Sequence, residues 1–339
     1  MDPDQKPVAV SMGEPAGIGL ELALVAWNNR RSLRLPPFYV RGDETLLAER
    51  AAAIGMKIRI ESVSPDQAVR QFSKSLPVVQ TGPALTDRPG EEQEGTAQSV
   101  VACIEGCVED IRGGLASSLV TNPINKAALY RTGFSYPGHT EFLGALARKY
   151  WPDEPAEPVM MIAGPELLVV PVTIHIPIRD VPAVLTEDLI VKTAEITARD
   201  LADRFGYSNP RLALCGLNPH AGENGTIGTE DRDVIAPAVA RLRAKGIAAS
   251  GPHAADTLFH APARKEYDCV LGMYHDQVLV PAKTIGFDDS VNVTLGLPFV
   301  RTSPDHGTAY GLAGAGTARI DSFAAALRMA NVLANPEKL

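Results

Sequence analysis

Short apolar runs alternate with longer segments of helical periodicity along most of the chain. Between residues 96 and 111, apolar side chains recur every three or four positions, which places them on one face of a helix. The pattern predicts strands at residues 7–12, 38–40, 118–120, 212–217, 269–274 and 291–295, and helices at 21–27, 44–53, 96–111, 187–205 and 231–245. Because strands and helices alternate, we expect an α/β fold with a largely parallel sheet.

Residues 159–162 and 167–176 depart from this alternation, because two apolar runs follow each other with Gly164 and Pro165 at their junction. Such a pair predicts an antiparallel hairpin. No internal repeat, low-complexity stretch or linker marks a domain boundary in the sequence. A chain of 339 residues is nevertheless long enough for two domains.

Composition and charge narrow the classes of partner. The chain is 45% hydrophobic and 21% charged, as folded globular proteins are, and its formal net charge is -8. A negative chain without a basic stripe is poorly suited to a nucleic-acid backbone, so we expect no nucleic-acid partner. No signal-peptide core is visible, and no apolar run reaches the roughly 18–20 residues that span a bilayer. We therefore expect a cytoplasmic protein that does not bind membranes.

Three of the seven histidines share one sequence context. His175, His220 and His275 each lie at or just past the C-terminal end of a predicted strand, where ligands bind in open α/β sheets. Three neutral imidazoles that converge there would hold a divalent ion such as Zn²⁺ and leave positions open for substrate. Taken singly, each histidine is better explained as a hydrogen-bonded structural residue. Because the same context occurs three times, the metal hypothesis carries the same weight as the structural explanation.

A second group of residues suits an anionic ligand. Lys283, Asn292 and Arg301 follow His275, and lysine and arginine near a crevice can clamp a phosphate or carboxylate. His139 and Thr140 lie at a predicted helix start, where backbone N–H groups attract anions. The competing interpretations are solvated surface charges for Lys283 and Arg301, and a simple N-cap for Thr140.

Two glycine-rich stretches, residues 13–19 and 311–316, match neither the GxGxxG dinucleotide fingerprint nor a P-loop. The first still joins a predicted strand to a predicted helix, so its backbone could approach a ligand closely. The residues alone therefore indicate an α/β enzyme with a metal ion and an anionic substrate.

Six motifs extend this interpretation. They are MGEPAGIG at 12–19, PGHTEFL at 137–143, LNPHAGE at 217–223, ADTLF at 255–259, MYHDQ at 273–277 and NVTLGLPFVRTS at 292–303. In this order they resemble the 4-hydroxythreonine-4-phosphate dehydrogenase family of pyridoxal phosphate biosynthesis. The resemblance extends from residue 8 to about residue 330.

This resemblance implies an isocitrate/isopropylmalate-dehydrogenase-like fold of two α/β domains with a cleft between them. The first domain would comprise residues 1–125 and about 300–339. The second, about 126–299, would carry the metal histidines and the interface of a homodimer with shared active sites. That superfamily binds NAD or NADP without the usual glycine fingerprint, which agrees with the absence of the fingerprint here.

The same resemblance implies roles for individual residues. His175, His220 and His275 match metal ligands contributed across the dimer interface, with one divalent ion (Zn, Mg or Co) per site, and Asp256 would lie close to that ion. The positions that match substrate contacts are His139, Thr140, Lys283, Asn292 and Arg301. Lys283 and Asp256 are the catalytic candidates. Lys283 is the candidate general base, because a desolvated lysine can be neutral near pH 7.

The family reaction is the oxidation of 4-phosphohydroxy-L-threonine at its C3 hydroxyl by NAD or NADP. The product, 2-amino-3-oxo-4-phosphooxybutanoate, then loses its carboxylate to give 3-amino-1-hydroxyacetone phosphate. Such an enzyme would bind a small phosphorylated substrate.

The chain departs from the family pattern at Glu14, Leu20, Thr226 and the acidic stretch 287–290. These departures leave the substrate and cofactor preference open. A sister dehydrogenase that acts on threonate or erythronate 4-phosphate is therefore an alternative. A metal-dependent hydrolase or lyase, and a binding protein without enzymatic activity, are more distant alternatives. The complete GHTEF stretch at 138–142 argues against the dihydrodiol dehydrogenase branch.

Overall fold

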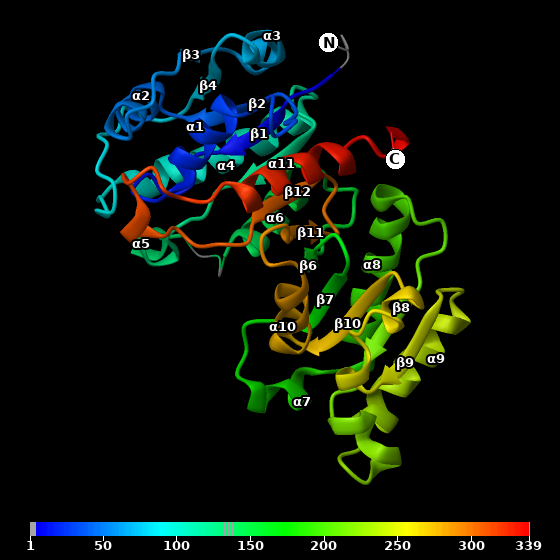
Figure 1. Ribbon diagram of the computed structural model, residues 1–339. Coiled ribbons are helices and arrows are strands. Elements are labelled where there is room, and N and C mark those ends of the chain that lie inside the picture. The colour runs from blue at the N-terminus through cyan, green and yellow to red at the C-terminus, as the bar shows by residue number, and fades with distance from the viewer. Residues whose placement is uncertain (1–4, 132, 135, 137, 339) are drawn as a thin grey trace. The chain divides into compact units, whose positions relative to one another are not determined.

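The computed structural model describes residues 5–131, 133–134, 136 and 138–338, so Pro137 of the PGHTEFL motif lies outside the described residues. The chain divides into two compact units. The first unit comprises Met1–Pro158 and Leu297–Ala334, and the second comprises Val159–Gly296 and Asn335–Leu339. Both units combine a sheet with helices, as the alternating pattern predicts (Figure 1).

The sheet of the first unit consists of parallel strands in the order β3-β4-β2-β1-β5-β12. Their bounds are β1 Val8–Ser11, β2 Phe38–Gly42, β3 Ile60–Ser62, β4 Leu76–Gln80, β5 Ser118–Thr121 and β12 Arg301–Pro304. The central strands β1 and β5 are buried along their whole length, which is usual for parallel strands covered by helices on both faces.

The helices of the first unit are α1 Gly19–Asn28, α2 Glu44–Ala53, α3 Ala68–Phe72, α4 Thr96–Arg112, α5 Lys126–Arg131, α6 His139–Tyr150 and α11 Asp321–Leu333. Short 3-10 turns lie at Pro65–Gln67 and Tyr310–Leu312. α11 packs against β12 and β5, so the end of the chain completes the unit that β1 begins (red and blue in Figure 1).

The first unit extends past the predicted boundary at residue 125, to Pro158. The reason is that α5 and α6 pack against α4, the helix that precedes β5. His139 and Thr140, at the start of α6, therefore belong to the first unit together with Arg301.

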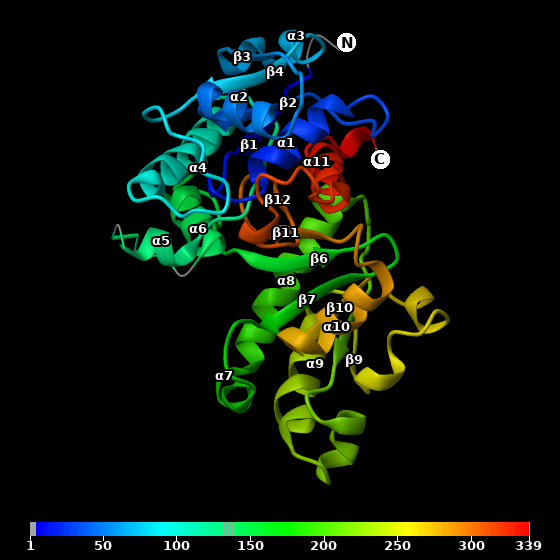
Figure 2. The same ribbon diagram turned by 60° about the vertical axis from the view of Figure 1, so that its left-hand side comes forward.

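The sheet of the second unit has the strand order β11-β6-β7-β10-β8-β9, and all of these strands except β8 are labelled in Figure 2. The strands are β6 Val159–Ala163, β7 Leu168–Thr173, β8 Leu212–Cys215, β9 Ala249–His253, β10 Cys269–Tyr274 and β11 Val291–Leu295. β6 and β7 pair antiparallel, which confirms the predicted hairpin, and β7, β10, β8 and β9 run parallel.

The helices of the second unit are α7 Val181–Val184, α8 Glu187–Phe205, α9 Ala236–Ala244 and α10 His275–Gly286. A π-helical turn at Asp231–Ile235 precedes α9, and 3-10 turns lie at Ile178–Asp180, Pro219–Gly225, Ala255–Thr257, Ala263–Lys265 and Pro336–Lys338. α10 packs closely against its own strand, because a Cβ added at Gly272 on β10 would lie only 2.3 Å from Val278 Cγ1. This close packing positions His275, the first residue of α10.

In the part of the chain that the structure describes, no helix is both long enough and apolar enough to cross a bilayer.

Candidate active site

Two of the predicted metal histidines lie side by side in the second unit. His175 follows β7 and His275 follows β10, and these strands are parallel neighbours, so their carboxyl ends lie together. The centroids of the two imidazole rings are 5.6 Å apart. With Zn–N bonds of about 2.0–2.1 Å, two imidazoles on one ion have centroids roughly 5 Å apart. The pair is therefore close to the geometry of a shared metal ion.

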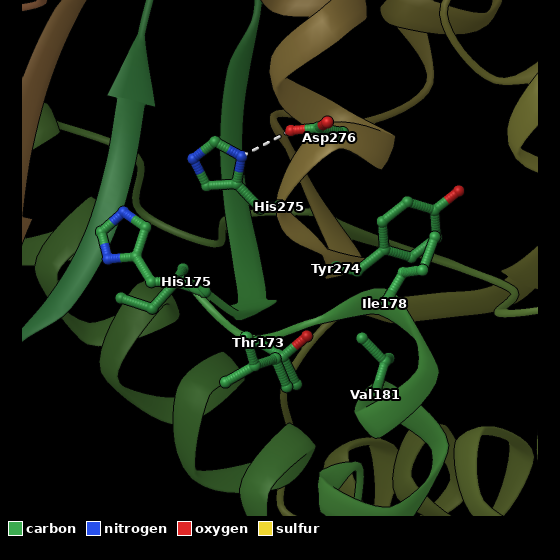
Figure 3. Close-up of a pocket in the computed structure, with 9 residues that line it drawn as sticks. Thr173, His175, Ile178, Val181, Tyr274, His275 and Asp276 are labelled. Carbon is green, nitrogen blue, oxygen red and sulfur yellow. Dashed lines mark hydrogen bonds and ion pairs between the residues drawn. The ribbon is translucent and has the colours of Figure 1, made fainter.

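The histidine pair borders a pocket of about 250 Å³ (Figure 3). Its lining comprises Thr173, Ile174, His175, Ile176, Ile178, Val181, Tyr274, His275 and Asp276. Asp276 lies 2.7 Å from His275 Nδ1, and a carboxylate in this position orients the ring for its other nitrogen to bind a ligand. Thr173 Oγ1 donates a hydrogen bond of 2.7 Å to Met273 O, which ties the two strand ends together.

His220 lies in a separate group of polar residues after β8. Its Nδ1 lies 2.8 Å from Glu223 Oε1, and this hydrogen bond raises the pKa of His220, with a smaller contribution from the charge of Asp256. Among the described residues, no three His, Cys, Asp or Glu side chains converge closely enough to hold a metal ion. The structure thus brings together two of the three histidines and leaves His220 beside Glu223 and Asp256.

The backbone at His175 and His220 is unusual. Their φ angles are 50° and 52°, and the residues from His220 to Asn224 all have positive φ. Each such residue other than glycine costs on the order of 1–3 kcal/mol, and strain of this kind concentrates at functional sites. Two of the three positions where the sequence predicts metal ligands are therefore also positions of local backbone strain.

A second, more open pocket of about 570 Å³ lies beside the first, and Tyr274 and Asp276 line both. Asp256 and Arg264 add charged groups to its wall, and Arg264 pairs with Glu166. The remaining lining is mostly apolar and includes Phe259, Val280, Pro281 and Ile285.

Two predicted substrate contacts of the second unit lie outside these two pockets. Lys283 is on α10 and Asn292 on β11, and both side chains are half-buried. Neither residue lines the two pockets.

The first unit holds the other predicted substrate contacts. Arg301, only 4% exposed, donates from Nη2 to Thr121 Oγ1 at 2.6 Å, and burial lowers its pKa to about 10. His139 has a buried Nε2 with no hydrogen-bond partner among the described residues. Burial, followed by the charges of Arg301 and Lys126, holds the pKa of His139 well below its usual range, so the imidazole is neutral at pH 7.

Thr140 is not the N-cap of α6. That position is occupied by Gly138, which has no side chain to cap the helix, and Thr140 is the second residue of α6. The first backbone N–H groups of α6 consequently lack a side-chain cap, next to His139.

A buried network of ion pairs and hydrogen bonds connects loops of the first unit. Arg50, fully buried, donates to the carbonyl oxygens of Pro15 and Gly17, both at 2.9 Å, and pairs with Glu21 and Asp87. Glu21 in turn accepts hydrogen bonds from the backbone N–H groups of Gly314 and Gly316. The two glycine-rich stretches that the sequence singles out are thus joined through one ion cluster.

Comparisons with known proteins identify the family. The model of the pyridoxal phosphate biosynthetic protein PdxA matches residues 34–330. A 4-hydroxythreonine-4-phosphate dehydrogenase of Bradyrhizobium diazoefficiens is 52% identical over 337 residues, which cover 97% of each chain. This chain belongs to the PdxA family.

Solved structures agree with the PdxA assignment. The crystal structure of a 4-hydroxythreonine-4-phosphate dehydrogenase from Klebsiella pneumoniae superposes with a TM-score of 0.85 at 36% identity, covering 97% of this chain and 100% of that one. A terephthalate 1,2-cis-dihydrodiol dehydrogenase from Burkholderia xenovorans gives 0.64 at 25% identity, covering 96% and 98%. The isocitrate/isopropylmalate-dehydrogenase-like α/β fold expected from the sequence is confirmed.

Sequence reasoning did not single out three charged neighbours of these PdxA residues. Asp276 accepts a hydrogen bond from His275, and Glu223 accepts one from His220. Lys126 acts electrostatically on His139. For the two acids a signal was available, because each lies within three residues of a candidate ligand. Nothing in the sequence links Lys126 to His139.

Proposed function

We propose that this protein is an NAD(P)-dependent and divalent-metal-dependent dehydrogenase that oxidises 4-phosphohydroxy-L-threonine to 2-amino-3-oxo-4-phosphooxybutanoate in pyridoxal phosphate biosynthesis. The observation that carries the proposal is the His175–His275 imidazole pair at adjacent strand ends, in a chain 52% identical to a dehydrogenase of that name. The oxidised product then decarboxylates to 3-amino-1-hydroxyacetone phosphate.

Two neighbouring imidazoles of the second unit, His175 and His275, suit a divalent ion, and a third ligand would have to approach them. His220, paired with Glu223, would be that third ligand. Such an ion supplies a Lewis acid that polarises the oxygen on which negative charge develops. Zn, Mg and Co remain the candidate ions, and imidazole ligands favour the transition metals among them.

Three groups of the first unit suit the substrate phosphate. Arg301 offers a buried guanidinium, His139 a neutral imidazole, and Thr140 a hydroxyl at an uncapped helix start. Lys283 and Asn292 of the second unit are the remaining proposed contacts.

The oxidation moves one proton and one hydride. The C3 hydroxyl proton would pass to a general base, for which we propose the Lys283 amine, and a bound nicotinamide cofactor would supply the hydride acceptor. The electron pair of the C–H bond leaves with the hydride, and the resulting ketone lies β to the carboxylate. Cleavage of the carboxylate as CO₂ then leaves its bonding pair on the carbon next to the ketone. Asp256, beside His220, is the proposed acidic neighbour of the metal.

The proposal includes a homodimer with shared active sites and a cytoplasmic location. Ile176 and Ile178, which line the histidine pocket, are 36% and 71% exposed, and Val280 of the second pocket is 61% exposed. Apolar side chains exposed around a polar site are typical of a protein interface.

The direct test follows the absorbance of NADH or NADPH with a panel of substrates. The panel comprises 4-phosphohydroxy-L-threonine, its unphosphorylated analogue, and threonate and erythronate 4-phosphates, each with NAD or NADP and added metal. We expect the highest kcat/KM with 4-phosphohydroxy-L-threonine. A higher value with either sugar-acid phosphate would establish the sister activity instead. Substrate consumption without cofactor reduction would establish a hydrolase or lyase.

A further inference from the structure

A lysine outside the motifs lies beside the proposed phosphate site of the first unit. Lys126 is the first residue of α5 and follows β5 in the chain. Its Nζ lies 3.3 Å from the point where a Cβ on Gly138 would be, so the ammonium group is next to the residue that caps α6. It is also close enough to His139 for its charge to lower the pKa of that imidazole.

Lys126 is exposed, and its charge lies at one helix N-terminus and beside another. A cation at the first residue of a helix opposes the helix dipole, and the N-terminus of α6 lies alongside. Glu141 Oε2 lies 3.4 Å from the same Gly138 point, yet no salt bridge joins Glu141 to Lys126 in the described residues. An anion bound at the start of α6 would be attracted by the exposed ammonium group of Lys126 and by the uncapped helix N-terminus together.

Charge balance supplies a second and independent argument. A phosphate monoester carries roughly -1.5 to -2 charges at pH 7. Arg301 contributes one positive charge, whereas His139 is neutral and contributes hydrogen-bonding capacity only. Arg301 alone does not balance a phosphate dianion, and within the first unit Lys126 is in place to add a second positive charge beside Glu141.

We propose that Lys126 is a further substrate-binding residue, which pairs with the phosphate group beside His139 and Arg301. This inference rests on the proposed function, since it takes the anion to be a phosphate monoester. Lys126 thereby contributes to the preference for phosphorylated over unphosphorylated substrate, and to a preference for the dianion over the monoanion.

The experiment compares Lys126→Ala and Lys126→Arg with a matched control, Lys57→Ala, an exposed lysine on the loop before β3. We expect Lys126→Ala to raise KM for 4-phosphohydroxy-L-threonine about 10- to 100-fold, the usual contribution of one charge-assisted hydrogen bond. The loss on the unphosphorylated analogue should be smaller, kcat should change little, and Lys126→Arg should restore most of the affinity.

Two further measurements separate a phosphate contact from a structural role. In the wild type, KM should fall as pH rises through about 6, where the phosphate dianion forms, and this dependence should flatten in Lys126→Ala. Calorimetry with inorganic phosphate should show weaker binding to Lys126→Ala than to Lys57→Ala. Unchanged thermal unfolding would exclude a general loss of structure.

The outcomes distinguish this proposal from the proposed function. If the wild type prefers the phosphorylated substrate but Lys126→Ala behaves like Lys57→Ala, Lys126 does not bind phosphate and the proposed function stands. If the wild type shows no such preference, the proposed function fails, and phosphate calorimetry still decides whether Lys126 binds the anion.

Discussion

The two histidine-bearing regions of this protein present opposite chemical surroundings. In the first unit, His139 lies with Arg301 and Lys126, its Nε2 is buried, and Arg301 is 4% exposed. In the second unit, the His275 side chain is 33% exposed and that of His220 is 62% exposed, and each contacts a carboxylate. The first region is cationic, with a buried guanidinium and an exposed ammonium group, and the second is more open and acidic.

This difference indicates which ligand each region is built to receive. The desolvated guanidinium of Arg301 and uncapped helix N–H groups suit an anion, because water competes weakly with the ligand there. Imidazoles oriented by carboxylates suit a metal ion, because the carboxylate raises the basicity of the ligand nitrogen. The exposed apolar side chains around the second region are the ones that the proposed dimer interface would bury.

Metal removal should produce the largest effect and tests the acidic region. We expect chelation to abolish cofactor reduction and a divalent ion to restore it, because the proposed reaction needs the ion as a Lewis acid. His275→Ala should lose bound metal, measured by mass spectrometry, whereas His260→Ala, an exposed histidine of the same unit, should retain it. Full activity in a verified metal-free preparation would overturn the assignment.

Loss of Arg301 tests the cationic region. Arg301→Ala removes a bidentate donor, and losing about two charge-assisted hydrogen bonds lowers kcat/KM for the phosphorylated substrate roughly 10²- to 10⁴-fold. The unphosphorylated analogue should lose much less, and Arg301→Lys should recover only part, because lysine lacks the planar fork. Steady-state kinetics on both substrates measure the difference. An equal loss on both would assign Arg301 to another group of the substrate or to the fold.

The buried network of Arg50, Glu21 and Asp87 in the first unit predicts a difference in stability between the two units. Arg50→Met leaves the buried carboxylates of Glu21 and Asp87 without their cation, which costs about 3–5 kcal/mol in the free energy of unfolding. The matched control is Arg232→Ala in the second unit, where the exposed Arg232–Asp233 pair contributes about 0–1 kcal/mol. Urea unfolding measures both variants. If Arg50→Met lowered the free energy of unfolding no more than Arg232→Ala does, the network would not stabilise the unit.

The fold was largely accessible from the sequence, because hydrophobic periodicity reports burial directly. The helix at residues 96–111 appears as α4 Thr96–Arg112, and the predicted hairpin appears as β6 and β7. The division of the chain was harder to predict. It depends on α5 and α6 packing against α4, a long-range contact that no local pattern records.

The site was accessible only in part, for a related reason. Strand-end position predicts that His175 and His275 meet, because β7 and β10 are neighbours in the sheet. It does not predict that the segment after β8 follows a left-handed path, which leaves His220 with Glu223. Lys126 was missed because its relation to His139 arises from the approach of α5 to the start of α6.

Subunit mixing decides whether the cationic region and the metal region act together within one chain or across two chains. Arg301→Ala inactivates the cationic region and His275→Ala inactivates the metal region. If each active site combines the first unit of one subunit with the second unit of its partner, a heterodimer of these variants has one doubly defective site and one intact site.

Random exchange makes half of the dimers heterodimers, so a shared site should restore about a quarter of wild-type activity. Mixing Arg301→Ala with His139→Ala is the control, because both residues lie in the first unit and each site of that heterodimer lacks one of them. Mass spectrometry of labelled chains verifies the exchange. If exchange is complete and activity does not return, the cationic and acidic regions of a single chain form the site, and the dimer, where present, does not share it.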